Sequence, residues 1–173
     1  MATTAITPDQ DVVTAEIFIA APPERVFQAI TDPKQPPQWW GQQGVYRVTD
    51  WKGDLRVGGK WSSTGMGADG KGFTVEGEYL AIDPPRRLVY TWIASFMGPH
   101  TTTVHWELEP RDVHGLQARG PQKMGKGTMV KIRHEGFAGA PQGMAAAHSQ
   151  GWIRVLGWIQ AFAEEGKTID TRE

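Results

Sequence analysis

The sequence predicts an α+β fold in which a curved antiparallel sheet of six or seven strands wraps around one long C-terminal helix, with two short helices near the N-terminus. Three observations support this class. Apolar residues alternate with a period of two over residues 46–134, and turn residues interrupt the alternation at short intervals. A single apolar stripe at helical spacing follows over residues 143–165. The length of 173 residues is sufficient for one domain of this kind.

The N-terminal part predicts a strand followed by two short helices. Residues 1–11 show no periodicity and are expected to form a flexible tail. Residues 13–19 are rich in strand-forming side chains and are expected to form a strand. A helix is expected to begin at Pro22-Pro23-Glu24, because proline suits a first turn and an acidic side chain there complements the helix dipole. Asp32-Pro33 ends this helix, and Pro36-Pro37 limits the length of the second one.

Six further strands are expected in the central region, because glycine, proline and aspartate residues that favour turns separate its alternating apolar runs. These strands span residues 46–51, 59–65, 72–82, 86–97, 101–109 and 126–135. Strands joined by such short connections lie antiparallel to each other. The connection over residues 111–126 is longer, contains three Gly and one Pro, and is expected to be a mobile loop.

The last predicted element is an amphipathic helix over residues 143–165. Its apolar stripe recurs at alternating steps of three and four, at Ala145, His148, Trp152, Val155, Ile159 and Phe162. Such a stripe must be buried against another layer, and a twisted antiparallel sheet offers one broad face that curls around a helix. Gly166 is placed to cap the helix. We therefore expect a single domain over residues 12–166, followed by a tail over residues 167–173.

Alternation also assigns an inner face to each strand, and this face mixes large aromatic rings with very small residues. Close packing is difficult where large and absent side chains alternate, so an internal cavity is expected between the sheet and the helix. A few polar groups in an aromatic hollow are typical of a small-molecule site. The candidate cavity residues are Trp40, Trp61, Ser63, Tyr79, Tyr90, Trp92, Trp106, His134, His148 and Trp152. The alternative is that the rings fill the space and each polar group has a backbone partner.

Two pairs of residues have specific expectations attached to them. Adjacent helical residues point about 100° apart, so one of Trp39 and Trp40 is expected at the pocket and the other against the sheet edge. His134 and His148 are expected to meet, because both point inward from different elements. They are either buried neutral imidazoles with satisfied ring nitrogens, or groups with a ligand-binding or acid–base role.

Composition excludes several classes of protein. The absence of Cys excludes a disulfide framework, a thiol nucleophile and a thiolate-held metal, and no pair of His has the spacing of a helical metal site, so neither metal nor cofactor is expected. A net charge of -1 argues against a nucleic-acid partner. No apolar stretch reaches the length of a membrane span and no export signal precedes the first strand, so we expect a cytoplasmic protein without membrane insertion. The sequence is compatible with a homodimer.

One glycine-rich segment has the spacing of a nucleotide-binding motif. Residues 65–70 fit the pattern G-x-G-x-x-G, but a strand rather than a helix is predicted after them. The interpretation is therefore a hairpin turn.

Five sequence blocks, in order along the chain, resemble one known family. They are Ala21-Pro22-Pro23-Glu24-Arg25-Val26-Phe27 with Trp39-Trp40-Gly41, Asp54 to Trp61, Gly77-Glu78-Tyr79 through Trp92, Thr128 to His134, and His148-Ser149-Gln150-Gly151-Trp152. This pattern is similar to the activator of Hsp90 ATPase homologue 1-like (AHSA1-like) branch of the START/Bet v 1-like (SRPBCC) superfamily. The resemblance implies the helix-grip fold and a cavity between the sheet and the C-terminal helix. It covers about residues 13–162.

The resemblance implies a class of function without fixing an activity, since members include lipid and polyketide binders, cyclases and a domain of an Hsp90 co-chaperone. Our leading hypothesis is a protein that binds a hydrophobic or aromatic small molecule in the cavity. The alternative is an enzyme of the polyketide cyclase or dehydratase type that uses His148 or His134 as a base. A third class, an Hsp90 partner, is not expected, because the co-chaperone has a further N-terminal domain for which 173 residues leave no room.

Overall fold

The sheet is antiparallel throughout and holds nine strands within the residues that the computed structural model describes, 1–112 and 126–172. The strands are β1 (Thr3–Ile6), β2 (Val12–Ile19), β3 (Gly41–Gln42), β4 (Tyr46–Gly53), β5 (Lys60–Gly67), β6 (Gly72–Asp83), β7 (Arg87–Ala94), β8 (Thr102–Asp112) and β9 (Lys126–Glu135). Their order across the sheet is β1-β2-β9-β8-β7-β6-β5-β4-β3. Each of the seven predicted strands is present, and β1 and β3 are additional.

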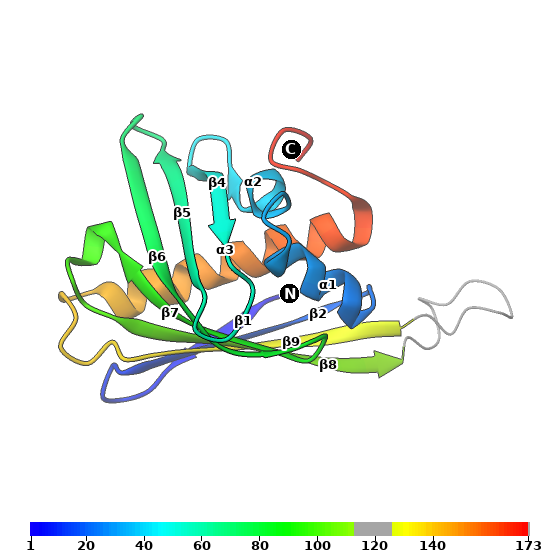
Figure 1. The fold of residues 1–173 in the computed structure, drawn as a ribbon, viewed down its shortest axis with the longest axis horizontal. Helices are drawn as coiled ribbons and strands as arrows, with labels where there is room; N and C mark the ends of the chain where they lie inside the picture. The colour runs from blue at the N-terminus through cyan, green and yellow to red at the C-terminus, as the bar shows by residue number, and fades with distance from the viewer. Residues whose placement is uncertain (113–125, 173) are drawn as a thin grey trace, which may run out of the picture.

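The helices cover one side of this sheet. They are α1 (Pro23–Thr31), α2 (Pro36–Trp39), the short 3-10 helix η1 (Ser95–Met97) and α3 (Met144–Glu165). Figure 1 shows α3 running along the inner side of the bent sheet, with α1 and α2 at one end. The predicted helix-grip architecture is therefore confirmed, and α3 begins and ends within one residue of its predicted limits.

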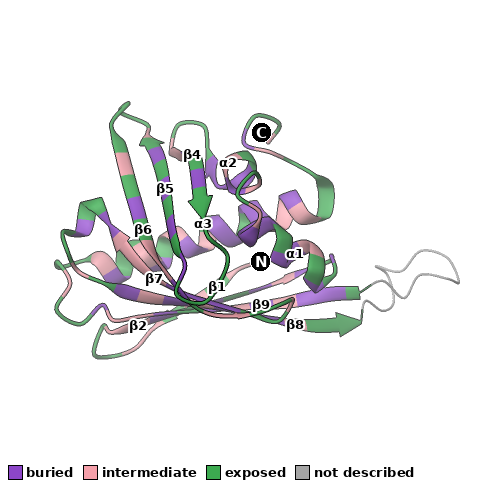
Figure 2. Cartoon of the chain, viewed as in Figure 1, coloured by how far each residue is buried: buried purple, intermediate pink, exposed green. Residues whose placement is uncertain are grey.

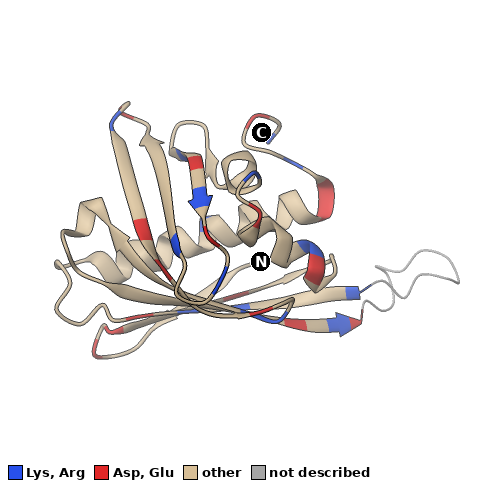
Figure 3. Ribbon diagram, viewed as in Figure 1, with Lys and Arg blue, Asp and Glu red and all other residues tan. Residues whose placement is uncertain are grey.

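The pattern of burial follows the predicted inner face. Buried residues recur along α3 and along the strands that face it (Figure 2). On β2, for example, Val13, Ala15, Ile17 and Ile19 are buried, whereas Thr14 and Glu16 are exposed. Acidic and basic side chains are spread over the strands from β2 to β9, whereas most of α3 carries none (Figure 3).

The small residues of the inner face are matched to large ones on the neighbouring strand. Trp61 pairs with Gly77, and its indole crosses that glycine to donate a hydrogen bond to the carbonyl oxygen of Thr91 at 3.2 Å. A Cβ at position 77 would lie 1.9 Å from the same oxygen, so only glycine fits there. Gly65 pairs with Phe73, whose ring occupies the space of a side chain at position 65. Large and absent side chains therefore pack together at these positions.

The prediction of tails over residues 1–11 and 167–173 is wrong, because described residues in both segments pack against the domain. Residues 3–6 form β1, which pairs with β2 and is tied to α3 by a hydrogen bond from Ser149 to Thr4. Four residues are too few to show a period in the sequence. At the other end, Ile169 is 1% exposed and packs into the fold.

A mobile loop was expected over residues 111–126, but the flanking strands extend into both ends of this range. Arg111 and Asp112 belong to β8, and Lys126 begins β9, because cross-strand pairing continues to the Asp112–Lys126 pair. The rest of the prediction, over residues 113–125, lies outside the described residues.

Candidate functional site

A cavity of 370 Å³ lies between α3 and strands β4 to β7. Aromatic and aliphatic side chains form most of its wall. The lining residues are Trp40, Tyr46, Val48, Trp51, Ser63, Gly67, Phe73, Val75, Trp92, Phe96, Met144, Ala147, His148, Gly151, Trp152 and Val155. None of these described lining residues is Asp, Glu, Lys or Arg. The cavity therefore suits an uncharged, largely apolar guest.

Trp40 is the centre of the aromatic wall. Its ring centroid lies 5.9 Å from that of Trp51, 6.4 Å from that of Trp92 and 6.3 Å from that of Trp152. The other tryptophan of the tandem, Trp39, is fully buried and donates a hydrogen bond to the carbonyl oxygen of Ala29 at 2.9 Å. As expected, one tryptophan faces the cavity, while the other holds α2 in place, through its hydrogen bond to α1.

His148 supplies an uncommitted hydrogen-bond acceptor at the cavity. Its Nδ1 lies 2.8 Å from the carbonyl oxygen of Met144, which only accepts, so Nδ1 carries the hydrogen. The lone pair therefore sits on Nε2, which makes no hydrogen bond to another described residue. Burial lowers the pKa of His148, so the ring is neutral near pH 7. A neutral imidazole of this tautomer accepts a hydrogen bond from a hydroxyl group.

Ser63 adds a second polar group to the wall. The residue is 4% exposed, and its hydroxyl makes no hydrogen bond to any side chain or backbone group in the described part of the chain. A third polar group, the Tyr46 hydroxyl, accepts a hydrogen bond from Trp40 Nε1 at 3.3 Å. The wall thus offers a few polar atoms within a mainly aromatic surface.

His134 lies behind the wall, and both of its ring nitrogens form hydrogen bonds. Its Nδ1 accepts a hydrogen bond from Trp152 Nε1 at 3.1 Å, so its Nε2 carries the hydrogen and donates to the Thr102 hydroxyl at 2.7 Å. Burial lowers the pKa of His134 well below the ordinary value, and the nearby His148 lowers this pKa further. His134 is therefore a buried neutral imidazole with both nitrogens satisfied. The two histidine rings meet as predicted, with their centroids 5.2 Å apart.

The structure separates the ten predicted site residues into two layers. Trp40, Ser63, Trp92, His148 and Trp152 line the cavity. Trp61, Tyr79, Tyr90, Trp106 and His134 do not; each is at most 2% exposed and packs behind the wall. Two members of this second layer bond to each other, because Trp106 Nε1 donates a hydrogen bond of 3.0 Å to the Tyr90 hydroxyl.

Trp51 is a lining residue that sequence reasoning missed. Strict alternation along β4 would place Trp51 on the face opposite to Val48. The register of β4 against β5 shifts between Val48 and Asp50, and this irregularity brings Trp51 to the same face as Val48. Its ring then stacks on Trp61 with centroids 4.7 Å apart. The bulge leaves no clear signal in the sequence.

Phe73, Phe96 and Met144 also line the cavity, and none of them is among the ten predicted site residues. Phe96 is 53% exposed, although its ring lies 6.2 Å from that of Phe73 and 6.1 Å from that of His148. An exposed aromatic ring that also lines the cavity indicates the mouth. Because η1 interrupts the predicted strand at this point, the ring of Phe96 follows no strand alternation.

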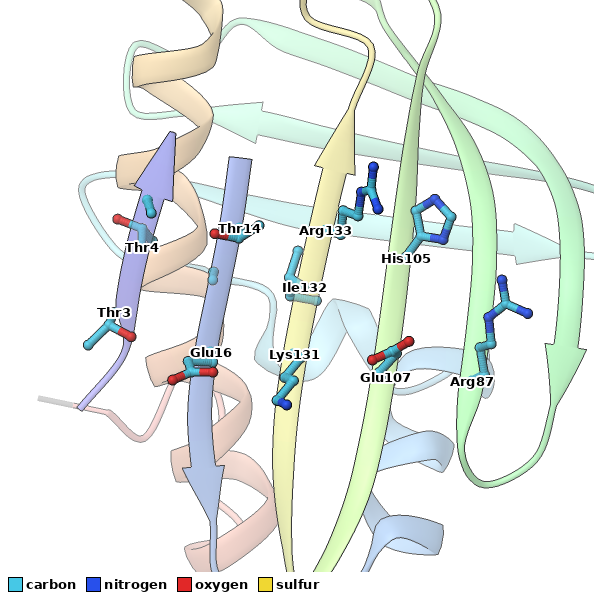
Figure 4. A pocket seen from close by; sticks show the side chains of 12 residues that line it. Thr3, Thr4, Thr14, Glu16, Arg87, His105, Glu107, Lys131, Ile132 and Arg133 are labelled. Atoms are coloured by element: carbon cyan, nitrogen blue, oxygen red, sulfur yellow. The ribbon is translucent and has the colours of Figure 1, made fainter. Parts of the chain in front are cut away.

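The outer face of the sheet carries a second hollow, of 610 Å³, which Figure 4 shows. Its charged side chains alternate in sign from strand to strand. Glu16, Lys131, Glu107 and Arg87 are successive cross-strand neighbours on β2, β9, β8 and β7. Opposite charges on neighbouring strands stabilise a solvent-facing sheet surface. We therefore take the inner cavity as the candidate site.

No group of three or more His, Asp or Glu in residues 1–112 and 126–172 is arranged to hold a metal ion. No helix in the same part of the chain is long and apolar enough to cross a membrane.

Acidification below a pH of about 6.5 is expected to destabilise the fold through the two histidines. Burial holds the pKa of both His134 and His148 below the ordinary value in the folded chain, so the unfolded chain binds more protons. The stability that they contribute is complete above a pH of about 6.5 and is lost as the pH falls toward the folded pKa, by up to about 1.4 kcal/mol per pH unit for each histidine. Urea unfolding between about pH 7.5 and about pH 5.5 measures this loss.

The variant His148→Gln provides the control for this prediction. It removes one of the two protons taken up on unfolding, so the pH dependence of the unfolding free energy should become weaker; the larger part should remain, because burial lowers the pKa of His134 further than that of His148. An unfolding free energy that does not change over the same pH range would contradict the assignment of neutral, buried imidazoles.

The fold and the cavity together define a helix-grip protein of the START/Bet v 1-like class. Comparison with family models identifies the family: the model described as activator of Hsp90 ATPase homolog 1-like protein matches residues 20–117. The chain belongs to this family. No curated protein matches the sequence.

Solved structures agree with the fold. Protein CV1439 of Chromobacterium violaceum is 24% identical with a TM-score of 0.67, over 89% of this chain and 97% of that one. Protein Ms6760 of Mycobacterium smegmatis is 19% identical with a TM-score of 0.70, over 95% and 98% of the two chains. DynU16, a protein of the dynemicin biosynthetic locus, is 22% identical with a TM-score of 0.63; the match covers 91% of this chain and 48% of DynU16.

Proposed function

We propose that the chain binds a small, uncharged aromatic molecule in the cavity between α3 and the sheet, and that a hydroxyl group of this molecule donates a hydrogen bond to His148 Nε2. The observation that carries the proposal is the composition of the cavity wall. Indole and phenyl rings surround 370 Å³ with no charged lining residue among those described. This volume lies near the lower end of the range for ligand pockets, roughly 300–1,000 Å³.

Aromatic rings favour an aromatic guest for a physical reason. Ring pairs in offset or edge-to-face contact gain about 0.5–1.5 kcal/mol beyond the burial of their area. Such rings line the cavity on three sides. Trp40 follows α2, Trp92 belongs to β7 and Trp152 belongs to α3. A charged guest would lose its hydration without gaining a counter-charge, so it is disfavoured.

The polar group of the guest follows from His148. Because Nδ1 is committed to the Met144 carbonyl, Nε2 is an acceptor, and it pairs with a donor such as a phenolic hydroxyl. A guest without a donor would cover this acceptor and leave it without a partner, which costs about 1–3 kcal/mol. The site should therefore distinguish a phenol from its methyl ether.

Three naphthalene derivatives test this proposal in calorimetric titrations. 2-Naphthol is expected to bind, and 2-methoxynaphthalene is expected to bind roughly tenfold more weakly, because it cannot donate a hydrogen bond. 2-Naphthoate should bind worst of the three because of its charge. Bound 2-naphthol should also raise the melting temperature, since a ligand at about 100 times its Kd stabilises the folded state by about 2.7 kcal/mol.

The variant His148→Ala separates the hydrogen bond from the aromatic contacts. In this variant the difference between 2-naphthol and its methyl ether should disappear, while weak binding of both persists. Absence of heat and of a thermal shift with all three compounds would contradict the proposed function. Equal affinity of the wild-type chain for the phenol and the ether would contradict the role of His148 alone.

A further inference from the structure

The segment that follows α3, residues 167–172, supplies hydrogen bonds to α2. We call this segment the C-terminal clasp. Helix α2 has only four residues, so the carbonyl oxygens at its end lack partners within the helix. The backbone N–H of Ile169 donates to the Gln38 carbonyl at 2.8 Å. Arg172 Nη2 donates to the Trp39 carbonyl at 2.8 Å and also to the Gly41 carbonyl.

The clasp is anchored along its length. Ile169 is 1% exposed, and Asp170 forms an ion pair with Arg47 at 3.3 Å. The guanidinium carbon of Arg172 lies 5.5 Å from the ring centroid of Trp158, which faces it from α3. Figure 1 shows the segment, in red, curling back beside α2 and β4 after the end of α3. Arg172 thus connects α3 to the backbone around α2.

The backbone that the clasp holds carries Trp40. The carbonyl of Trp40 itself accepts a hydrogen bond from the N–H of Val48 at 2.9 Å, while Arg172 holds the carbonyls of the residues on either side. The position of the Trp40 ring in the cavity wall therefore depends on Arg172, although Arg172 does not line the cavity. A guanidinium group suits this task because it carries several N–H donors: Nη2 serves both carbonyls, while Nε donates to the Thr168 carbonyl at 3.3 Å.

We propose that Arg172 is a positioning residue: through its hydrogen bonds to the Trp39 and Gly41 carbonyls it fixes Trp40 in the cavity wall and thereby sets the affinity of the cavity for its guest. The part of this inference that concerns affinity rests on the proposed function, whereas the part that concerns the Trp40 ring does not. Loss of the guanidinium should loosen one wall of the cavity without removing any lining side chain.

The variant Arg172→Gln tests this inference with two measurements. Its near-ultraviolet circular dichroism should weaken, because the stacked indoles of Trp39 and Trp40, 5.0 Å apart, lose their fixed geometry. Its affinity for 2-naphthol should fall by roughly tenfold at a temperature well below its melting point. The matched control is Arg56→Gln, which removes an exposed ion pair with Asp54 and should leave both measurements unchanged.

Two results would overturn the inference. One is an Arg172→Gln variant with the spectrum and the affinity of the wild-type chain. The other is a variant that melts at a lower temperature but keeps both properties, which would show that Arg172 only stabilises the fold. If Arg172→Gln does not fold, Arg172→Lys, which keeps the charge but lacks the planar guanidinium, should show a smaller loss of both. If the wild-type chain does not bind 2-naphthol, the proposed function fails and the spectrum alone decides the role of Arg172.

Discussion

Gly151→Leu is expected to reduce the affinity for 2-naphthol by roughly hundredfold while the chain stays folded. Gly151 lies on α3 within the cavity lining, and a Cβ built at this position meets nothing within 4 Å. A leucine side chain can therefore occupy the space of the guest without displacing the wall. Replacing glycine in a helix also favours the helix by up to about 1 kcal/mol, so stability should not fall. Calorimetric titration and urea unfolding measure the two quantities.

The same helix provides a matched control at Gly157. A Cβ at this exposed position also meets nothing within 4 Å, and Gly157 does not line the cavity. Gly157→Leu should therefore keep the affinity of the wild-type chain, with the same gain in helix propensity. Equal affinities of the two variants would contradict binding at the cavity.

Trp40→Ala is expected to lower the free energy of unfolding by about 3–5 kcal/mol, the usual cost of truncating a buried tryptophan. Trp40 is 4% exposed and stacks on Trp39 and Trp51, with ring centroids 5.0 and 5.9 Å away. Its truncation also leaves the Tyr46 hydroxyl without its donor. Urea unfolding at neutral pH measures this loss.

Phe96→Ala is the comparison for this prediction. Phe96 lines the same cavity but is 53% exposed, so its truncation should cost no more than about 1 kcal/mol. A loss for Trp40→Ala as small as that for Phe96→Ala would contradict the view that Trp40 is the centre of the wall.

The main features of the fold could be predicted from the sequence, because each depends on a periodic pattern. The inward positions of β2 and the stripe of α3 follow directly from periods of two and of three to four. The strand β1 could not be predicted, since Thr3–Ile6 is too short for a period and is held by its pairing with β2. The clasp could not be predicted either, because its hydrogen bonds join residues far apart in the sequence, such as Arg172 and Trp39.

The cavity was predicted because large and small side chains alternate on the inner face, and this reason is only partly correct. Small residues on the inner face suggested unfilled space, but Gly77 and Gly65 lie directly beneath the rings of Trp61 and Phe73. Which aromatic rings reach the cavity depends on cross-strand register and on the bulge in β4. Neither is encoded in a local pattern, so the sequence could suggest the layer of aromatic residues but could not separate the lining rings from those behind them.

The most direct test of ligand binding in the cavity uses the indole N–H resonances of the eight tryptophans in a two-dimensional nitrogen–proton spectrum. Addition of 2-naphthol should shift the resonances of Trp40, Trp51, Trp92 and Trp152, which line the cavity. The resonance of Trp106, which lies behind the wall with its N–H bonded to Tyr90, should move least. A spectrum in which saturating 2-naphthol shifts none of the four lining tryptophans would contradict the account.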